Sequence, residues 1–316
     1  MNIEPKDFNI LNLNILTNEN TELETLKLNQ TIFPVFGDIN QIILNAKDSD
    51  IIMLQNNFDE FQLGIKFTYL NEKYFLKTFT SKDNRLTHEA FVGLTAINNI
   101  SGFVKTYTIG YNNKIFYNNK IYEYDFIVIE YIEGLTFRQI FQYINELSIY
   151  DFQIILLQIF NSLLIANRLY KFTHYDLHKD NIIIKKLDEE IVVNILNRKF
   201  TTRYIPIIID LELSHIIIDN INYGINIQNA NVYNINYILS DIINLFISLY
   251  GTIEDNKYKS FNSLTKKYLN YFFNNFNDQL YQEINTRGLG YSIKYASFDL
   301  ENFMKFIFST ISYKLF

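Results

Sequence analysis

The chain has 316 residues, of which 48% are hydrophobic and 20% charged, with only 10 glycines and 3 prolines. Such a composition buries a large core and excludes a disordered, collagen-like or linker protein. The net charge of −6, without a long basic run, argues against nucleic acid as a partner. The absence of cysteine excludes disulfides and thiolate metal sites, and it suits an intracellular location.

Strand-forming segments follow a first stretch, residues 1–45, that we treat as an N-terminal extension. Three segments between residues 51 and 79 are rich in β-branched and aromatic residues and are separated by turn-forming residues. A helix is predicted over residues 86–98, and strands resume after it. This order predicts a small antiparallel β lobe with one helix over residues 46–132.

Long helical patterns replace the strands after residue 133. Helices are predicted over residues 136–146 and 148–171, and beyond residue 235 over residues 238–250, 261–276 and 300–311. The second helix is apolar but is interrupted by glutamine, asparagine and arginine, which predicts a buried helix and no membrane partner. Between the helical regions we predict two strand pairs, 182–186 with 191–196 and 200–205 with 207–218. The chain is therefore expected to be an α+β protein whose larger, mainly helical lobe spans residues 133–316.

The strongest chemical signal is the run HYDLHKDN, residues 174–181, which lies between a buried helix and an apolar strand. It places Asp176 and Asn181 in an H-x-D-L-x-x-x-N pattern. Asp210 ends an apolar run downstream, while Lys77 ends a strand upstream and Glu89 lies in the next predicted helix. In order and in residue type, this set resembles the catalytic machinery of the protein-kinase superfamily, and it implies the two-lobed protein-kinase-like fold.

The resemblance implies a role for each of these side chains in phosphoryl transfer from ATP. Lys77 is expected to hold the phosphates, and Glu89 to hold Lys77. Asp176 is expected to act on the proton of the attacking hydroxyl. Asn181 and Asp210 are expected to present oxygen ligands to Mg²⁺, a hard cation that prefers them. ATP and Mg²⁺ are therefore the predicted cofactors.

Further positions follow from the same resemblance. Residues 126–137 are similar to the hinge between kinase lobes, where the extended backbone at Glu130 and Ile132 is expected to bind the adenine edge. Asp241, in a later helix, is expected to brace the catalytic loop from below. His174 is expected to hold the shape of that loop and not to act in the chemistry.

Details around the catalytic loop indicate a branch of the superfamily. His178, an extra hairpin over about residues 191–205 and the run DLELS resemble haspin-type kinases. Residues 88–103 and 203–210 are similar to serine/threonine protein kinases of giant DNA viruses. This likeness implies protein substrates with Ser or Thr hydroxyls as acceptors, and an intracellular location in the cytoplasm of a host cell or in a virion.

Departures from the superfamily pattern bear on activity. The glycine-rich phosphate loop is reduced to Gly64, and Glu212 stands where the metal-binding motif has glycine. Tyr175 replaces the arginine that usually pairs with a phosphorylated activation loop. We therefore hypothesise that activity does not depend on phosphorylation in the segment after Asp210. The candidate hydroxyls there are Ser214, Tyr223 and Tyr233.

Two other functions stay open on the sequence. A pseudokinase scaffold is consistent with the reduced phosphate loop, and a small-molecule kinase of the choline or aminoglycoside type is consistent with the run DLE at residues 210–212. Basic residues also gather around the predicted hairpin, where a solvated surface is the default and a docking site for an acidic partner is the alternative. These residues are Lys185, Lys186, Arg198, Lys199 and Arg203.

Overall fold

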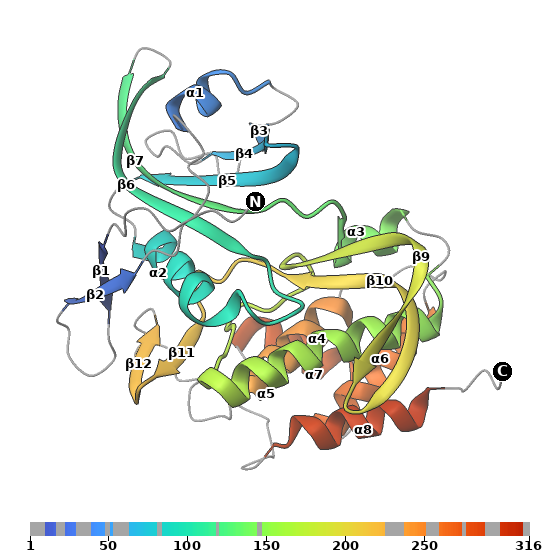
Figure 1. The fold of residues 1–316 in the computed structure, drawn as a ribbon. Coiled ribbons are helices and arrows are strands. Elements are labelled where there is room, and N and C mark those ends of the chain that lie inside the picture. Colours follow the sequence, from blue (N-terminus) through green and yellow to red (C-terminus); the bar gives the residue numbers. More distant parts are fainter. Residues whose placement is uncertain are drawn as a thin grey trace.

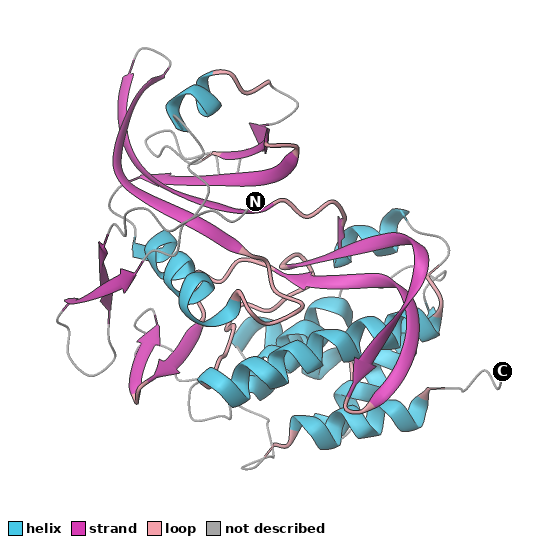
Figure 2. Cartoon of the chain, in the orientation of Figure 1, coloured by secondary structure: helices cyan, strands magenta, loops and turns pink. Residues whose placement is uncertain are grey.

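The computed structural model describes residues 10–16, 23–29, 39–47, 51–52, 63–80, 84–117, 120–143, 147–224, 237–250, 259–273, 276–287 and 298–311. These residues form a β-rich lobe and a larger lobe in which helices dominate (Figures 1 and 2). The predicted α+β, two-lobed organisation is therefore confirmed.

The β lobe is built on a five-stranded antiparallel sheet with the strand order β3-β4-β5-β7-β6. A tight turn at Leu70 and Asn71, both with positive φ (49° and 66°), joins the second of these strands to the third. Positive φ at both central residues is typical of a two-residue hairpin. The strands are β3 (Ile51–Ile52), β4 (Gly64–Tyr69), β5 (Glu72–Thr80), β6 (Thr106–Tyr117) and β7 (Lys120–Glu130).

Strand β5 separates two apolar clusters because successive side chains point to opposite faces of the sheet. Tyr74 and Leu76 pack in one cluster, against Ile39 and Ile43 of helix α1 (Ile39–Leu44). Phe79 packs in the other, toward helix α2 (Asn84–Val92), which continues as a π-helical turn over Gly93–Ile97. This alternation also places Lys77 on the side of the sheet that faces α2.

The predicted N-terminal extension contributes more than one element. Strands β1 (Ile10–Leu16) and β2 (Leu23–Asn29) form an antiparallel pair, and β1 lies near α2 (Figure 1). Helix α1, which belongs to the same stretch, packs on the β-lobe sheet. The predicted boundaries after residues 45 and 132 stay predictions.

The helical lobe is organised around α4 (Ile149–Tyr170). Its N-terminus has a capping box in which Ser148 and Asp151 satisfy each other's backbone amides, and it ends at Lys171, which has a left-handed φ of 51°. By length and composition α4 is the one described helix that could cross a membrane, but 67% of its apolar window is buried inside the chain. It is the buried core helix that its sequence predicts.

Five further helices surround α4. Four of them fall in the regions where helices were predicted, whereas α7 was not predicted because its sequence, DQLYQEINTR, is mostly polar. The helices are α3 (Phe137–Tyr143), α5 (Tyr237–Tyr250), α6 (Lys259–Phe272), α7 (Asp278–Arg287) and α8 (Leu300–Thr310).

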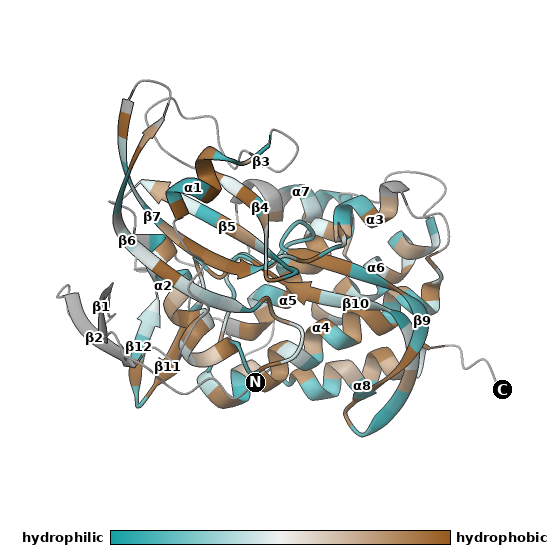
Figure 3. Ribbon diagram, turned by 45° about the horizontal axis from the view of Figure 1, so that its top comes forward, coloured by the Kyte–Doolittle hydropathy of each residue, from teal (hydrophilic) through white to brown (hydrophobic). Residues whose placement is uncertain are grey.

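One long hairpin replaces the two predicted strand pairs. Strand β9 (Ile182–Ile195) pairs along its length with β10 (Arg198–Ile208), so residues 200–205 do not pair with 207–218 as predicted. Leu196 and Asn197 both have positive φ and close a tight turn. Residues 187–190, which lie between the two members of the first predicted strand pair, are part of β9. Their side chains are mostly exposed on the hydrophilic part of the hairpin (Figure 3).

Shorter strands complete the helical lobe. Residues 131–134 lead from β7 to β8 (Leu135–Thr136), which pairs with β9. Gly134 is required in this connection because a Cβ there would lie 2.6 Å from the carbonyl oxygen of Ile184. After Asp210, β11 (His215–Ile218) and β12 (Ile221–Gly224) form a second, small hairpin.

Candidate active site

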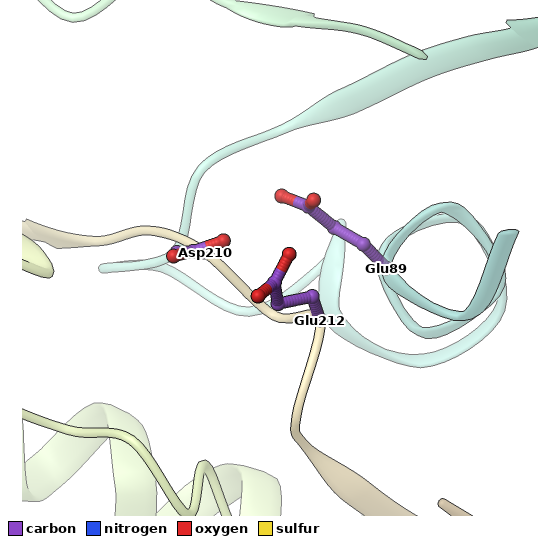
Figure 4. Close-up of side chains that lie close together, drawn as sticks. All are labelled: Glu89, Asp210 and Glu212. Carbon is purple, nitrogen blue, oxygen red and sulfur yellow. The ribbon is translucent and has the colours of Figure 1, made fainter. Parts of the chain in front are cut away.

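The site lies where β5, α2 and the end of β10 meet. The Nζ atom of Lys77 is 2.8 Å from Oε2 of Glu89 and 2.9 Å from Oδ1 of Asp210. It is also 3.7 Å from Oε2 of Glu212, whose other oxygen is 3.6 Å from Arg85. Figure 4 shows the three carboxylates converging on one point. The structure thus brings Lys77, Glu89 and Asp210 together, although Lys77 and Asp210 are 133 positions apart in the sequence.

The electrostatics of this cluster keep Lys77 charged. Burial alone lowers the pKa of its amine, but the carboxylates of Glu89, Asp210 and Glu212 together raise that pKa above its usual value. Burial raises the pKa of the Glu89 carboxyl, and the neighbouring Lys77 opposes this rise. Because the side chains of Lys77 and Glu89 are only 10% and 2% exposed, each depends on the other for compensation of its charge.

The catalytic loop is tied directly to the segment that carries Asp210. Nδ2 of Asn181 donates to the carbonyl oxygen of Asp176 (2.9 Å) and to its Oδ2 (3.2 Å). The carbonyl oxygen of Asn181 accepts from the amide of Ile209, the residue before Asp210. Asp176 itself is 44% exposed, so its carboxylate is open to a second molecule.

His174 and Asp241 hold this loop from the inside. The two carboxylate oxygens of Asp241 accept from the amides of His174 (2.7 Å) and Tyr175 (2.8 Å), which is the predicted bracing contact. Nε2 of His174 donates to the carbonyl oxygen of Ile209 (2.9 Å). Burial lowers the pKa of His174, in agreement with a neutral, structural ring.

Asp241→Asn is expected to lower the free energy of unfolding by about 1 to 3 kcal/mol, because only one of its two side-chain atoms still accepts a hydrogen bond and a buried amide loses its partner. Burial raises the pKa of the Asp241 carboxyl to about 7, although its two amide donors oppose that rise. Urea denaturation near neutral pH measures the effect. Asp219→Asn makes an equivalent change in the exposed turn after β11 and should not change the midpoint of urea denaturation. If Asp241→Asn also leaves this midpoint unchanged, the bracing role of Asp241 is contradicted.

Asn181 and Asp210 have the chemistry of a Mg²⁺ site. Because Nδ2 of Asn181 is directed at Asp176, its Oδ1 is directed away from that residue. Asp210 contributes a carboxylate that is 30% exposed. An amide and a carboxylate oxygen suit a hard cation, so these two residues fit the ion that the sequence predicted.

The predicted hinge positions lie at the junction of the lobes. The amide of Glu130 donates to the carbonyl oxygen of Lys105 (2.8 Å). Ile132 belongs to an apolar cluster with Phe79, Ala90 and other residues of the β lobe. Binding of adenine by these two positions stays a prediction. Most of the segment in which the phosphate loop is expected, LQNNFDEFQLGIK (residues 54–66), lies outside the described residues. The described part begins at Leu63, and Gly64 pairs with Lys77.

The structure adds residues that the motifs did not single out. His88, next to Glu89 on α2, donates from Nε2 to the carbonyl oxygen of Ser214 (2.6 Å), and burial lowers its pKa to about 4. The neutral His88 therefore links α2 to the segment after Asp210. Arg138 of α3 makes a two-point ion pair with Asp180 of the catalytic loop. These contacts join residues far apart in sequence, so no spacing pattern indicates them.

Two of the three candidate phosphorylation positions are enclosed. Ser214 is buried, and its hydroxyl donates to the carbonyl oxygen of Leu211 (2.5 Å). Tyr223 is 3% exposed and packs against Phe91 with ring centroids 4.9 Å apart. Tyr175, which stands in place of the arginine, lies edge-on to His215. Tyr233 lies outside the described residues.

No protein-family model matches the chain. Two curated proteins of Invertebrate iridescent virus 3 are similar to it. One, "Probable kinase 098L", is 33% identical over 110 residues, which cover 34% of this chain and 21% of that protein. The other, "Uncharacterized protein 035R", is 28% identical over 173 residues, 45% of this chain and 16% of that protein. The chain thus matches about a fifth or less of the length of each relative.

A solved structure, the kinase domain of PF14_0431, superposes on 82% of this chain and 83% of its own with a TM-score of 0.39 and 16% identity. This overall superposition is loose, so the description of the fold rests on the elements and contacts given above. The similarity to "Probable kinase 098L" supports a protein-kinase-like relationship of this chain with viral kinases.

Proposed function

We propose that the protein transfers the γ-phosphoryl group of Mg²⁺-bound ATP to Ser or Thr hydroxyls of protein substrates. One observation carries the proposal: the amine of Lys77 is held between Glu89 and Asp210, beside a loop in which Asn181 is hydrogen-bonded to Asp176. The similarity to a probable viral kinase supports the general activity.

The residues divide the chemistry among them. Lys77, kept charged by its carboxylate neighbours, neutralises phosphate oxygens and orients them. Asp176 orients the acceptor hydroxyl and takes its proton. Asn181 and Asp210 would hold Mg²⁺, which supplies positive charge against the triphosphate. Since most of this work is positioning, the fixed hydrogen bonds of the loop matter as much as the charges.

The proposed activity needs no phosphorylation of the segment after Asp210. His88 and the contact of Tyr223 with Phe91 hold that segment against α2, and the buried hydroxyl of Ser214 bonds within the segment to the carbonyl oxygen of Leu211. The ion pair of Lys77 and Glu89 is formed in the same state. These contacts support the hypothesis, drawn from Tyr175, that activity does not depend on phosphorylation in this segment.

Millimolar ATP with Mg²⁺ is expected to raise the melting temperature by about 2 to 5 °C, because a ligand that binds only the folded state stabilises it. Differential scanning fluorimetry with and without EDTA measures the shift and its dependence on the metal. AMP serves as the control, since it lacks the phosphates that Lys77 would hold. An unchanged melting temperature in the presence of ATP and Mg²⁺ would favour the pseudokinase scaffold.

A second acceptor class is favoured by the position of Glu212. Its carboxylate lies beside Lys77, with ligand atoms of Glu89, Asp210 and Glu212 all within 4.8 Å of one another. The run D-L-E that carries it resembles that of small-molecule kinases. Incubation with labelled ATP separates the two acceptors. Label on generic proteins such as casein or histones supports the protein kinase, whereas label only on small alcohols or aminoglycosides supports the alternative.

A further inference from the structure

A cavity of about 670 Å³ lies at the far end of the helical lobe, away from Lys77. It is formed by three elements that are distant in sequence: α4, the turn of the β9–β10 hairpin and α8. Figure 1 shows the hairpin curving from the junction of the lobes down to α8. None of the proposed roles in phosphoryl transfer involves a residue of this cavity, which we call the hairpin pocket.

The hairpin pocket is lined by both apolar and polar side chains. Leu164 of α4, Leu196 of the hairpin turn and Phe308 of α8 form an apolar floor, and Asn161, Asn194 and Asn197 also line the pocket. The ring of Phe308 stacks on Phe200 of β10, with centroids 5.5 Å apart and an angle of 11° between the rings. The floor is therefore built from side chains with fixed positions, as a preformed binding site requires.

Apolar surface also continues out of the pocket along α4. Ile165, which lines the pocket, is 38% exposed, and Leu169, one turn later on the same face, is 61% exposed. Most of α4 is buried, so these two side chains form an unusual exposed stripe on a core helix. A partner that covers both side chains would remove this apolar surface from water.

The rim carries three cations and one carboxylate. Arg168, Arg198 and Lys305 come from α4, β10 and α8 respectively, and Glu301 is the acid among them. Three positive groups against one negative group leave two excess positive charges, on a chain whose net charge is −6. This local excess complements an anionic partner.

Glu301 shows how the rim holds a carboxylate. It is 2.6 Å from Arg168 and 3.0 Å from Lys305, and these two cations lower its pKa. The guanidinium of Arg198 lies over the ring of Phe308, 4.7 Å from its centroid, at the edge of the apolar floor. A charged group above an apolar floor matches a peptide that presents acidic and apolar side chains together.

We propose that the hairpin pocket is a docking site for a partner-protein segment in which Asp or Glu alternates with Leu, Ile or Phe. The acidic side chains meet Arg198 and Lys305, and the apolar ones cover Ile165, Leu169 and the pocket floor. Nucleic acid fits less well, because the apolar floor offers nothing to a phosphate backbone. The proposal is independent of phosphoryl transfer.

Selection of a phage library of random 12-residue peptides on the full-length protein tests the proposal. Enriched peptides should combine acidic and apolar residues, and a fluorescein-labelled synthetic copy should bind in an anisotropy titration. Binding is expected to weaken at least tenfold in the double variant Arg198→Glu/Lys305→Glu, and about threefold or more in Ile165→Ser. Raising NaCl from about 50 to 500 mM should also weaken binding, because the contacts are partly ionic.

Lys199→Glu is the control for charge, since it reverses one charge, as Arg198→Glu alone does, on the exposed residue next to Arg198 and outside the pocket lining. It should change affinity less than twofold. The proposal is overturned if no acidic peptide is enriched, or if Lys199→Glu weakens binding as much as the double variant. It is equally overturned if Ile165→Ser binds normally, or if a 20-base-pair DNA duplex binds through Arg198 and Lys305 more tightly than the peptide does.

Discussion

Asp176→Asn is expected to lower the rate of phosphoryl transfer by about 100- to 10,000-fold, the contribution of a positioned general base, while the protein stays folded. The amide that replaces the carboxylate cannot take the proton of the acceptor hydroxyl. Its oxygen can still accept from Nδ2 of Asn181, which lies 3.2 Å from Oδ2 of Asp176, so the loop keeps its shape. Transfer of label from ATP by the purified variant measures the rate.

Asp180→Asn provides the control for this prediction. It makes the same chemical change four residues along the loop, at a carboxylate that pairs with Arg138 on the surface. Exposed ion pairs contribute little, so transfer should change by no more than a few-fold. Melting temperature with Mg²⁺ and ATP completes the test, because Asp176→Asn should still bind nucleotide. Undiminished transfer by Asp176→Asn would refute the assignment of the base.

Lys77→Met is expected to abolish both the stabilisation by ATP and phosphoryl transfer, because it removes the cation that would meet the phosphates. It also leaves Glu89 buried without a partner, which costs about 3 to 5 kcal/mol when one member of a buried ion pair is deleted. Chemical denaturation measures the loss of stability, and scanning fluorimetry with Mg²⁺ and ATP measures the loss of binding.

The stability of Lys77→Met should depend on pH in a defined direction. Without Lys77, burial raises the folded-state pKa of Glu89 above its unfolded value. The folded state then binds more protons than the unfolded state, so the stability of the variant falls as pH rises from the unfolded-state pKa of Glu89 to its folded-state pKa. The loss of stability relative to the unmodified protein is therefore larger at about pH 8 than at about pH 5. Lys77→Met/Glu89→Leu should recover stability at about pH 8 but no nucleotide binding. Nucleotide binding by either variant would contradict the assignment of Lys77 as the residue that holds the phosphates.

Much of the architecture could be predicted from local patterns. The alternation around Lys77 and the apolar run of α4 indicated a β lobe and a buried helix, because the side-chain periods of 2 and 3.6 residues are properties of the local chain. The polar helix α7 lacked such a signal. The extra hairpin expected over about residues 191–205 lies within the β9–β10 hairpin. The two predicted strand pairs were wrong, since the turn at Leu196 and Asn197 uses left-handed conformations without a glycine.

The candidate site, like the fold, was predicted only in part. Lys77, Glu89, Asp176, Asn181 and Asp210 were predicted by order and residue type, and the structure brings Lys77, Glu89 and Asp210 within hydrogen-bonding distance. The roles of His88 and Glu212 were not predicted. Each acts through a contact across more than 100 positions of the chain. A single sequence holds no pattern for such a contact.

The sequence by itself determined the classes of secondary structure, the set of candidate site residues and their order, because these depend on residues close together along the chain. Only the tertiary structure decided which charges are buried together around Lys77, which donors hold residues 174–175 on Asp241, and that three cations from separate elements line one pocket. Burial and distance set the strength of those interactions, and both arise only when remote segments pack against each other.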